Sequence, residues 1–228
     1  MKVFFDIETI PTQRADIIIS LTQKANADLI RGLYKIAQKY KKPEVIAKHQ
    51  EELTQELESA GRTMIEETSL NGLYGEVACI CWSMDGAIGS AYRMPGTSER
   101  QVIESFLDAI PPEGQRAVTF IGHNIDGFDL RFLWQRCVVH GLDGYRLNPS
   151  KCRFIDTMQE WVGKYTRGAK GVSLDSLCRA LGIKSSKGDI TGADVWQAYK
   201  DGRHTEIEAY CKDDVRAVVE VYGKMFGA

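Results

Sequence analysis

Two acidic residues stand at alternate positions in an apolar run near the start of the chain. The run is Val3-Phe4-Phe5-Asp6-Ile7-Glu8-Thr9, and Pro11 follows shortly after it. Because successive side chains of a strand point to opposite faces, Asp6 and Glu8 would share one face of a strand over residues 2–8. Two carboxylates so placed repel each other and lose hydration, so they need cations, hydrogen bonds or a shared proton. The pattern indicates a divalent metal site or, as the alternative, a solvent-facing strand end.

A second candidate group follows an apolar strand in the middle of the chain. The sequence Gly122-His123-Asn124-Ile125-Asp126-Gly127-Phe128-Asp129-Leu130 passes from that strand into a helix, which would place Asp129 in its first turn or so. A helix dipole favours an acid there by ~0.3–1 kcal/mol, so Asp126 and Asp129 also have a structural explanation. Asn124 could cap the helix or hold water or substrate. We expect His123 to be a hydrogen-bonded structural residue rather than a ligand.

The last predicted helix carries a third group. Tyr210 and Asp214 are four residues apart, so a phenol and a carboxylate would address one ligand from the same helical face. Asp213 points about 100° away around the helix, and we expect it to be solvated. Thr205 and Glu208 predict a capping box where the helix begins. The predicted buried face consists of apolar residues at helical spacing, namely Ile207, Cys211, Val215, Val218 and Val219.

The composition fits one domain that spans residues 1–228. Of these residues 43% are hydrophobic and 26% are charged, which is enough to bury a full core. A net charge of -2 and a pI near 6.1 exclude a strongly basic protein that coats DNA, so contacts with nucleic acid would be local or made through metal ions. Asp6 and Glu8 interrupt the first apolar run, and no segment approaches the length of a membrane span. We therefore expect a cytoplasmic protein with no signal peptide and no membrane contact.

The cysteines form no C-x-x-C pair and lie mostly in apolar segments. This pattern predicts reduced thiols, as in a cytosol, and no zinc site. The six residues are Cys79, Cys81, Cys137, Cys152, Cys178 and Cys211.

The spacing of hydrophobic residues and the turn-forming residues predict the strands and helices of the core. Residues 76–82 and 87–93 predict two strands joined by a turn at Asp85-Gly86. Ser98 opens the next helix, and residues 117–121 form a further strand. The core thus begins with three strands, a helix, a strand and a helix.

Two shorter helices are predicted between the middle and the end of the chain. Thr157 and Glu160 predict a capping box for the first, and Asp156 beside them could serve the cap alone. Ser173 predicts the start of the second helix, which ends at Gly182.

Between these helices lies a Gly-rich loop that carries the basic residues Lys164, Arg167 and Lys170. One interpretation is a contact with a nucleic-acid backbone. The other is a solvated loop without a ligand.

Residues 12–73 differ in composition from the rest of the chain and resemble a helical insertion after the first strand. Residues 24–42 are basic and residues 44–67 are acidic, each with apolar residues at helical spacing, and Pro43 separates them. One interpretation is a helical hairpin whose faces neutralise each other. Another is a lid whose basic helix touches nucleic acid. A third interpretation, based on the charge asymmetry, is that the insertion binds a protein partner.

Taken together, the three groups resemble the three exonuclease motifs of the DEDD superfamily. D-I-E-T lies in an N-terminal strand, H-N-x-x-x-F-D at a strand-to-helix junction, and Y-x-x-x-D in a C-terminal helix, the tyrosine being typical of the DEDDy branch. The insertion resembles that of free-standing relatives of the family B polymerase proofreading domain. The resemblance covers nearly the whole chain. It implies an α/β fold, a ribonuclease H-like mixed β-sheet flanked by helices.

The resemblance also implies roles for individual residues. Asp6, Glu8, Asp129 and Asp214 would bind two divalent ions, Mg²⁺ or Mn²⁺, and Tyr210 would hold the attacking water. The substrate would be contacted by three further residues, Thr9, Asn124 and Phe128, although Phe128 could equally fill the core beneath its helix.

Three functions are compatible with these features. The first is a 3′→5′ exonuclease that acts on single-stranded DNA and releases nucleoside monophosphates. The second is an exoribonuclease, because two-metal phosphoryl transfer does not depend on the sugar. The third is a nucleic-acid-binding module without catalysis, whose signature would be the loss of a site residue. All five catalytic candidates are present, so we expect an enzyme, with single-stranded DNA preferred over RNA.

Overall fold

The computed structural model describes residues 1–111, 117–163, 170–184 and 190–227, and it divides into two compact units. One unit consists of Met1–Ile10 together with Glu76–Ala228, and the other consists of Pro11–Gly75. Each is described by itself below.

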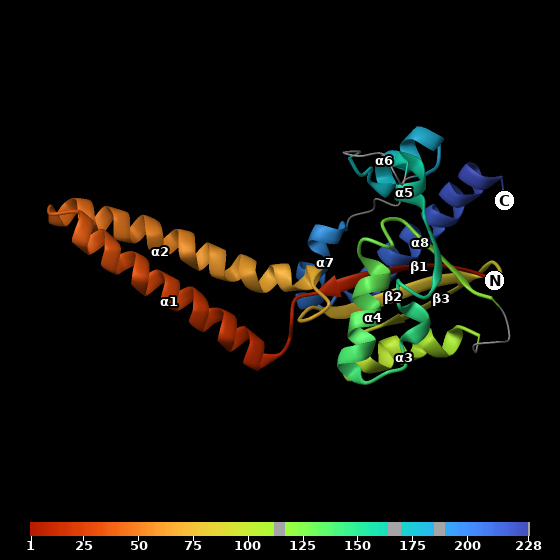
Figure 1. Ribbon diagram of the computed structural model, residues 1–228, viewed down its shortest axis with the longest axis horizontal. Coiled ribbons are helices and arrows are strands. Elements are labelled where there is room, and N and C mark those ends of the chain that lie inside the picture. Colours follow the sequence, from red (N-terminus) through yellow and green to blue (C-terminus); the bar gives the residue numbers. More distant parts are fainter. Residues whose placement is uncertain (112–116, 164–169, 185–189, 228) are drawn as a thin grey trace. The chain divides into compact units, whose positions relative to one another are not determined.

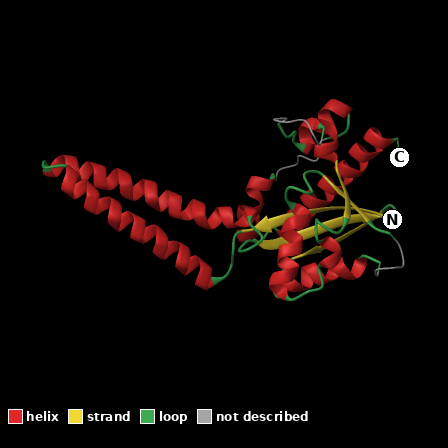
Figure 2. Cartoon of the chain, in the orientation of Figure 1, coloured by secondary structure: helices red, strands yellow, loops and turns green. Residues whose placement is uncertain are grey.

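The first unit is built on a five-stranded sheet in the described residues (Figures 1 and 2). Its order is β3-β2-β1-β4-β5, and β1 pairs antiparallel with β2 and parallel with β4. The sheet is therefore mixed, as expected, and β1 lies at its centre. The strands are β1 (Lys2–Ile10), β2 (Glu76–Met84), β3 (Ala87–Tyr92), β4 (Thr119–Gly122) and β5 (Arg153–Asp156).

Helices cover both faces of this sheet (Figure 1). On one face α3 (Glu99–Ala109) and α4 (Asp129–His140) pack over Phe5 and Ile7 of β1. On the other, α7 (Val195–Lys200) and α8 (His204–Phe226) pack over Ile10. The two short helices α5 (Thr157–Val162) and α6 (Leu174–Leu181) complete the unit, α6 packing on α8. The α/β fold with a mixed sheet flanked by helices is thus confirmed.

The predicted hairpin turn and two of the predicted helix starts are correct. Asp85 and Gly86 both have positive φ, as a tight hairpin turn between β2 and β3 requires. The hydroxyl of Ser98 accepts from the backbone N–H of Gln101 and forms a capping box with it at the start of α3. Ser173 caps α6, which ends at Gly182 in the left-handed conformation.

Two other capping predictions are wrong. The N-cap of α5 is Asp156, whose carboxylate accepts from the N–H groups of Met158 and Gln159, so Thr157 is already inside the helix. At the start of α8, Thr205 makes no cap, because the helix begins at His204 and the carboxylate of Glu208 instead accepts from Ser90 and Lys212.

The second unit is a helical hairpin of α1 (Ala15–Lys39) and α2 (Pro43–Glu66), followed by a 3₁₀ turn (Glu67–Leu70). The first helix extends further toward the N-terminus than the basic stretch 24–42 and ends at Lys39, and its first turns contain Ile17, Ile18 and Ile19. Pro43 begins α2 at its first helical position, where a missing N–H costs no hydrogen bond.

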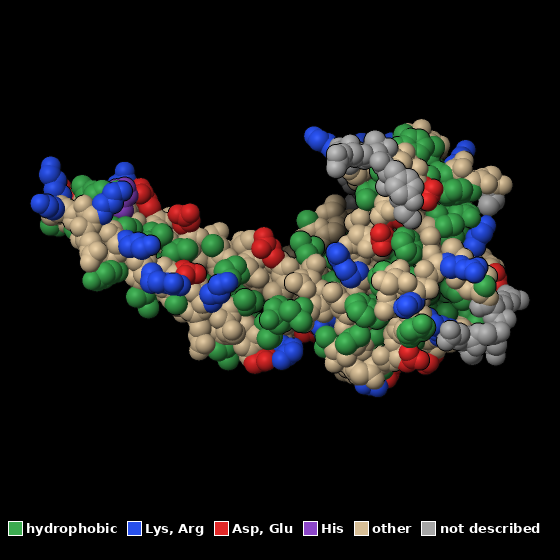
Figure 3. All heavy atoms as spheres, viewed as in Figure 1, with side chains coloured by type: hydrophobic (Ala, Val, Ile, Leu, Met, Phe, Trp, Pro, Cys, Tyr) green, Lys and Arg blue, Asp and Glu red, His purple; other side chains and the backbone are tan. Residues whose placement is uncertain are grey.

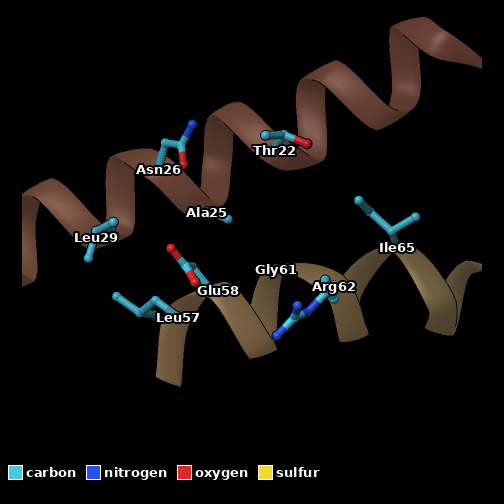
Figure 4. Close-up of a pocket in the computed structure, with 9 residues that line it drawn as sticks. All are labelled: Thr22, Ala25, Asn26, Leu29, Leu57, Glu58, Gly61, Arg62 and Ile65. Carbon is cyan, nitrogen blue, oxygen red and sulfur yellow. The ribbon is translucent and has the colours of Figure 1, made fainter. Parts of the chain in front are cut away.

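The two helices of the hairpin meet through apolar and small residues. A side chain at Gly32 would bring its Cβ to 2.6 Å from Leu53, and one at Gly61 would approach Ala25 to 3.3 Å. Between the helices lies a hollow of about 290 Å³ whose apolar lining includes Leu29, Leu57 and Ile65 (Figure 4). These glycines therefore make room for side chains of the facing helix.

The charged side chains of the hairpin pair along the chain rather than between helices. Among the residues that the structure describes, its ion pairs join Arg14 to Asp16, Arg31 to Asp28, and Glu52 to both Lys48 and His49. The predicted helical hairpin is confirmed, whereas the neutralisation of its basic helix by its acidic helix stays a prediction. Exposed lysines gather around the turn of the hairpin (Figure 3), namely Lys35, Lys39, Lys41, Lys42 and Lys48.

In the described residues, none of the helices combines the length and the hydrophobicity that crossing a lipid bilayer demands. Of the basic residues predicted in the Gly-rich loop, Lys164 and Arg167 lie outside the described residues. Lys170 is exposed.

Candidate active site

The central strand presents Asp6 and Glu8 on the face of the sheet that α8 covers. Ile7 between them packs into the opposite core cluster, as strand alternation requires. Glu8 is 7% exposed and Asp6 is half-buried, so both carboxylates have lost much of their hydration. Across the strand pair, Asp6 lies opposite Cys81 and Glu8 opposite Cys79.

Asp129 approaches the same strand from a different element. It is the first residue of α4 and is buried. Its Oδ1 accepts a hydrogen bond of 3.2 Å from the backbone N–H of Ile7, between the two acids of β1. The helix is therefore anchored to the strand through a carboxylate, which also benefits from the helix dipole.

Helix α8 supplies Asp214 and Tyr210. Asp214 is buried, and Tyr210 packs beside the apolar cluster under the helix. Burial, followed by the charges of Glu8, Asp214 and Asp6, raises the pKa of the Tyr210 phenol, so the two residues of α8 interact electrostatically with the acids of β1. Asp213, the neighbouring acid, is exposed and pairs with Arg216. The structure thus brings together the five residues that the motifs predict as catalytic.

The pKa values of the acids reflect burial and mutual repulsion. Burial, followed by the charges of Asp129, Glu8 and Asp214, raises the pKa of Asp6 well above its usual range. The pKa of Glu8 is raised by burial and by Asp214 and Asp129. Burial raises the pKa of Asp129 to about 8, although the N–H of Ile7 opposes the change. Without a positive charge among them, these carboxylates destabilise one another.

The donor set fits hard divalent cations. Within the described part of the chain, Asp6, Glu8 and Asp129 form no ion pair with lysine or arginine, so no side-chain cation balances them. Carboxylate oxygens are the ligands that Mg²⁺ and Mn²⁺ prefer. The residues present therefore suit the ions that the motifs imply.

A turn braced by Asp156 leads into α4. Asn124 adopts a left-handed backbone with φ of 62°, which asparagine tolerates better than most residues. The carboxylate of Asp156 accepts from the N–H groups of Asn124 at 3.0 Å and Asp126 at 3.2 Å. A Cβ at Gly127 would come within 2.3 Å of the Asn124 Oδ1, so this glycine leaves room for the amide.

The remaining predicted residues lie around this group. Phe128 is partly buried and packs 5.3 Å from Phe132, ring centre to ring centre, against the core. Thr9 is half-buried and directly follows Glu8, at the register shift between β1 and β2. His123 bonds to Thr157 and to the carbonyl of Val172, which confirms its structural role.

Sequence reasoning missed two features of this region. Asp156 caps α5, as the sequence allowed, but it also braces the turn at Asn124, and only its place at the end of a strand hinted at this second role. Cys79, Cys81 and Cys211 come together beside Asp6, a contact between distant segments that their spacing did not reveal.

Comparisons with known proteins show which protein family this chain resembles. Residues 77–226 match a family described as "Predicted 3'-5' exonuclease related to the exonuclease domain of PolB". The match includes Asn124, Asp129, Tyr210 and Asp214, and it begins after β1.

One curated relative is the putative DNA polymerase 060R of Frog virus 3 (isolate Goorha), 26% identical over 156 residues. That match covers 56% of this chain and 15% of the relative's length, so the chain corresponds to a small part of that protein.

Two solved structures are also similar to the chain. The family B DNA polymerase of the hyperthermophilic archaeon Pyrobaculum calidifontis matches with a TM-score of 0.59 and 16% identity, over 98% of this chain and 24% of the polymerase. E. coli Exonuclease I, in complex with an oligonucleotide, matches with a TM-score of 0.45 and 10% identity, over 99% of this chain and 40% of that one. The polymerase likeness agrees with the ribonuclease H-like fold expected from the motifs.

The family match spans more than half of the chain and agrees with the order of the motifs and with the sheet that carries them. The chain therefore belongs to the family of predicted 3′–5′ exonucleases related to the exonuclease domain of family B DNA polymerases.

Proposed function

We propose that this protein shortens single-stranded DNA from its 3′ end by hydrolysing phosphodiester bonds, using two Mg²⁺ or Mn²⁺ ions. The observation that carries the proposal is the meeting of Asp6, Glu8, Asp129 and Asp214, which come from three segments far apart in the sequence. The family description supports the direction of the reaction, and the polymerase relatives support DNA as the substrate.

The carboxylates would act as ligands rather than as bases. In their ionised form they repel a phosphodiester, because both groups are anions. Two bound divalent ions would supply the charge that admits the phosphodiester and the acidity that prepares water for attack. The rigid placement of Asp6 and Glu8 on the central strand, with Asp129 bonded between them, would fix the ligands for this task.

Tyr210 would orient the attacking water through its hydroxyl. An ordinary phenol has a pKa of ~10 and is protonated at neutral pH, so Tyr210 is a hydrogen-bond donor there. Burial and the nearby acids raise its pKa further. Asn124 and Thr9 would contact the terminal nucleotide, and Phe128 would position it from the edge of the core.

A gel time course with 5′-labelled single strands of matched sequence tests the proposal. DNA and RNA are each incubated with Mg²⁺, with Mn²⁺ and with EDTA. The wild type is compared with Asp214→Asn and with the matched control Asp213→Asn, which changes the exposed neighbour outside the group.

The expected result is a metal-dependent ladder that shortens from the 3′ end of DNA in the wild type and the control, and that is absent in Asp214→Asn. Faster shortening of RNA than of DNA would contradict the proposed DNA substrate and favour an exoribonuclease. Retained binding of both strands without cleavage would overturn the catalytic function altogether.

A further inference from the structure

Three thiols meet between β2 and α8. Cys79 and Cys81 lie at alternate positions of the strand and therefore on one face, and Cys211 reaches them from the helix. All three are fully buried, and all are free thiols. Their Sγ atoms lie within 4.8 Å of one another, and the distance from Cys79 to Cys81 is 3.7 Å.

The spacing of the sulfurs suits a tetrahedral metal ion. With Zn–S bonds of ~2.3 Å, two sulfurs on one tetrahedral Zn²⁺ lie ~3.8 Å apart. The Cys79 to Cys81 distance already matches this value. These two thiols of the strand therefore need little movement to bind such an ion.

Asp6 lies at the edge of the thiol group, next to Cys211. The Sγ of Cys211 lies 3.6 Å from the Oδ2 of Asp6, and Asp6, Glu8 and Cys211 form a second group whose ligand atoms lie within 4.8 Å of one another. Asp6 is half-buried whereas the thiols are fully buried, so an ion would enter from the side of the carboxylates.

We propose that Cys79, Cys81 and Cys211 form a site for one thiophilic divalent cation such as Zn²⁺, and that Asp6, which contacts Cys211, turns its carboxylate to serve as the fourth ligand. Thiolates select such soft or borderline ions, whereas the carboxylates beside them select Mg²⁺ and Mn²⁺. Binding would release the protons of the thiols to solvent.

This arrangement predicts a regulatory effect that rests on the proposed nuclease function. Under this proposal Asp6 is a ligand at both sites, so an ion on the thiols would draw this carboxylate away from the hard ions. Zn²⁺ would therefore inhibit the nuclease at a fixed Mg²⁺ concentration, and it would do so through the cysteines.

Titration with Cd²⁺ tests the site without any assay of activity. Cadmium bound to thiolates absorbs in the ultraviolet, and competition with a chromophoric chelator then gives the affinity for Zn²⁺. The variants are Cys79→Ala and Cys81→Ser. The matched control is Cys137→Ala, which removes an equally buried thiol from the opposite face of the sheet.

The wild type and Cys137→Ala should bind one Cd²⁺ per chain with a thiolate band. Each cluster variant should bind Zn²⁺ at least about 100-fold more weakly, because loss of an outer partner alone costs ~10–100-fold. Absence of the band in the wild type, or an unchanged band in a folded cluster variant, would overturn the site.

An assay of nuclease activity then distinguishes the proposed thiolate metal site from the proposed nuclease function. Zn²⁺ should inhibit the wild type and spare Cys79→Ala at the same Mg²⁺ concentration. If the wild type binds Cd²⁺ through its thiols but cleaves no nucleic acid, the metal site stands and the nuclease function fails. Equal inhibition of both proteins would overturn the regulatory role of the cluster.

Discussion

The carboxylate of Asp129 accepts its hydrogen bond from the backbone N–H of Ile7, the residue between Asp6 and Glu8. One bond thus joins the start of α4 to the middle of β1. The two acids of the strand point to one face, and the third acid is fixed against the backbone that separates them. The distance among the three groups is set by the backbone rather than by flexible side chains.

Replacing Asp129 by asparagine should remove the carboxylate charge while keeping the hydrogen bond from the backbone N–H of Ile7. The amide oxygen of Asp129→Asn can still accept from Ile7, while one of the mutually repelling charges is removed. In EDTA its melting temperature should equal or exceed that of the wild type. Saturating Mg²⁺, at 100 times its Kd, would stabilise the wild type by ~2.7 kcal/mol, and the variant should gain much less. Equal EDTA-dependent shifts in calorimetry would contradict a shared metal site.

Tyr210→Phe should lower turnover and preserve metal binding. The substitution removes one hydroxyl and leaves every carboxylate in place. Loss of a single hydrogen bond of ~1–1.5 kcal/mol to the reacting water corresponds to roughly tenfold in kcat. The Mg²⁺-dependent rise in melting temperature should match that of the wild type, whereas Asp214→Ala should lose both. If Tyr210→Phe also lost the metal-dependent rise, Tyr210 would have to support the ligands instead.

Asp156→Ala should destabilise the protein by at least ~3 kcal/mol. Its buried carboxylate accepts from the N–H groups of Asn124, Asp126, Met158 and Gln159, and each N–H left without a partner costs ~1–3 kcal/mol. Denaturant unfolding measures the change. The matched control is Thr205→Ala at the start of α8, where no side-chain cap forms, and it should fall within ~0.5 kcal/mol of the wild type. A larger effect at Thr205 than at Asp156 would refute this account of the caps.

Glu99 should make the free energy of unfolding depend on pH. Its carboxylate is buried, which opposes ionisation, but Arg136 and His140 bond to it and hold its pKa below the usual 4.5. The stabilisation is complete above pH 4.5, and it is lost as the pH falls through the lowered pKa of the folded state. At pH 7, Glu99→Gln removes the negative charge that faces the buried Arg136 guanidinium and should cost ~3–5 kcal/mol.

Melting curves from pH 7 to pH 3 check this prediction. The difference between the wild type and Glu99→Gln should shrink below pH 4.5. As a control, Glu104→Gln breaks the exposed pair with Arg100 and should cost less than ~1 kcal/mol at any pH. A difference that stays constant across the acid range would show that Glu99 acts through packing alone.

Much of the fold follows from local patterns in the sequence. The alternation around Asp6 and Glu8 predicts a strand with one acidic and one apolar face, and that strand is the centre of the sheet. The signals at Asp85-Gly86, Ser98 and Ser173 are also local, because each turn or cap is completed within three residues. Such features need no knowledge of the tertiary structure.

The features that sequence reasoning missed depend on contacts between distant segments. Glu208 has the spacing of a capping box with Thr205, but Ser90 on β3 binds its carboxylate instead. The bracing of Asn124 by Asp156 joins the ends of two neighbouring strands. The approach of Cys211 to the thiols of β2 likewise appears only once α8 lies on the sheet.

The route of the chain between β1 and β2 makes the helical hairpin an exchangeable module. Ile10 and Glu76 face each other across the antiparallel pair, and everything from Pro11 to Gly75 lies between them. Antiparallel neighbours can be joined by a two-residue turn, so an Asn-Gly linker could replace the hairpin without shifting any strand. Gene rearrangement or an engineer could therefore delete, lengthen or graft this segment while the acidic strand keeps its register.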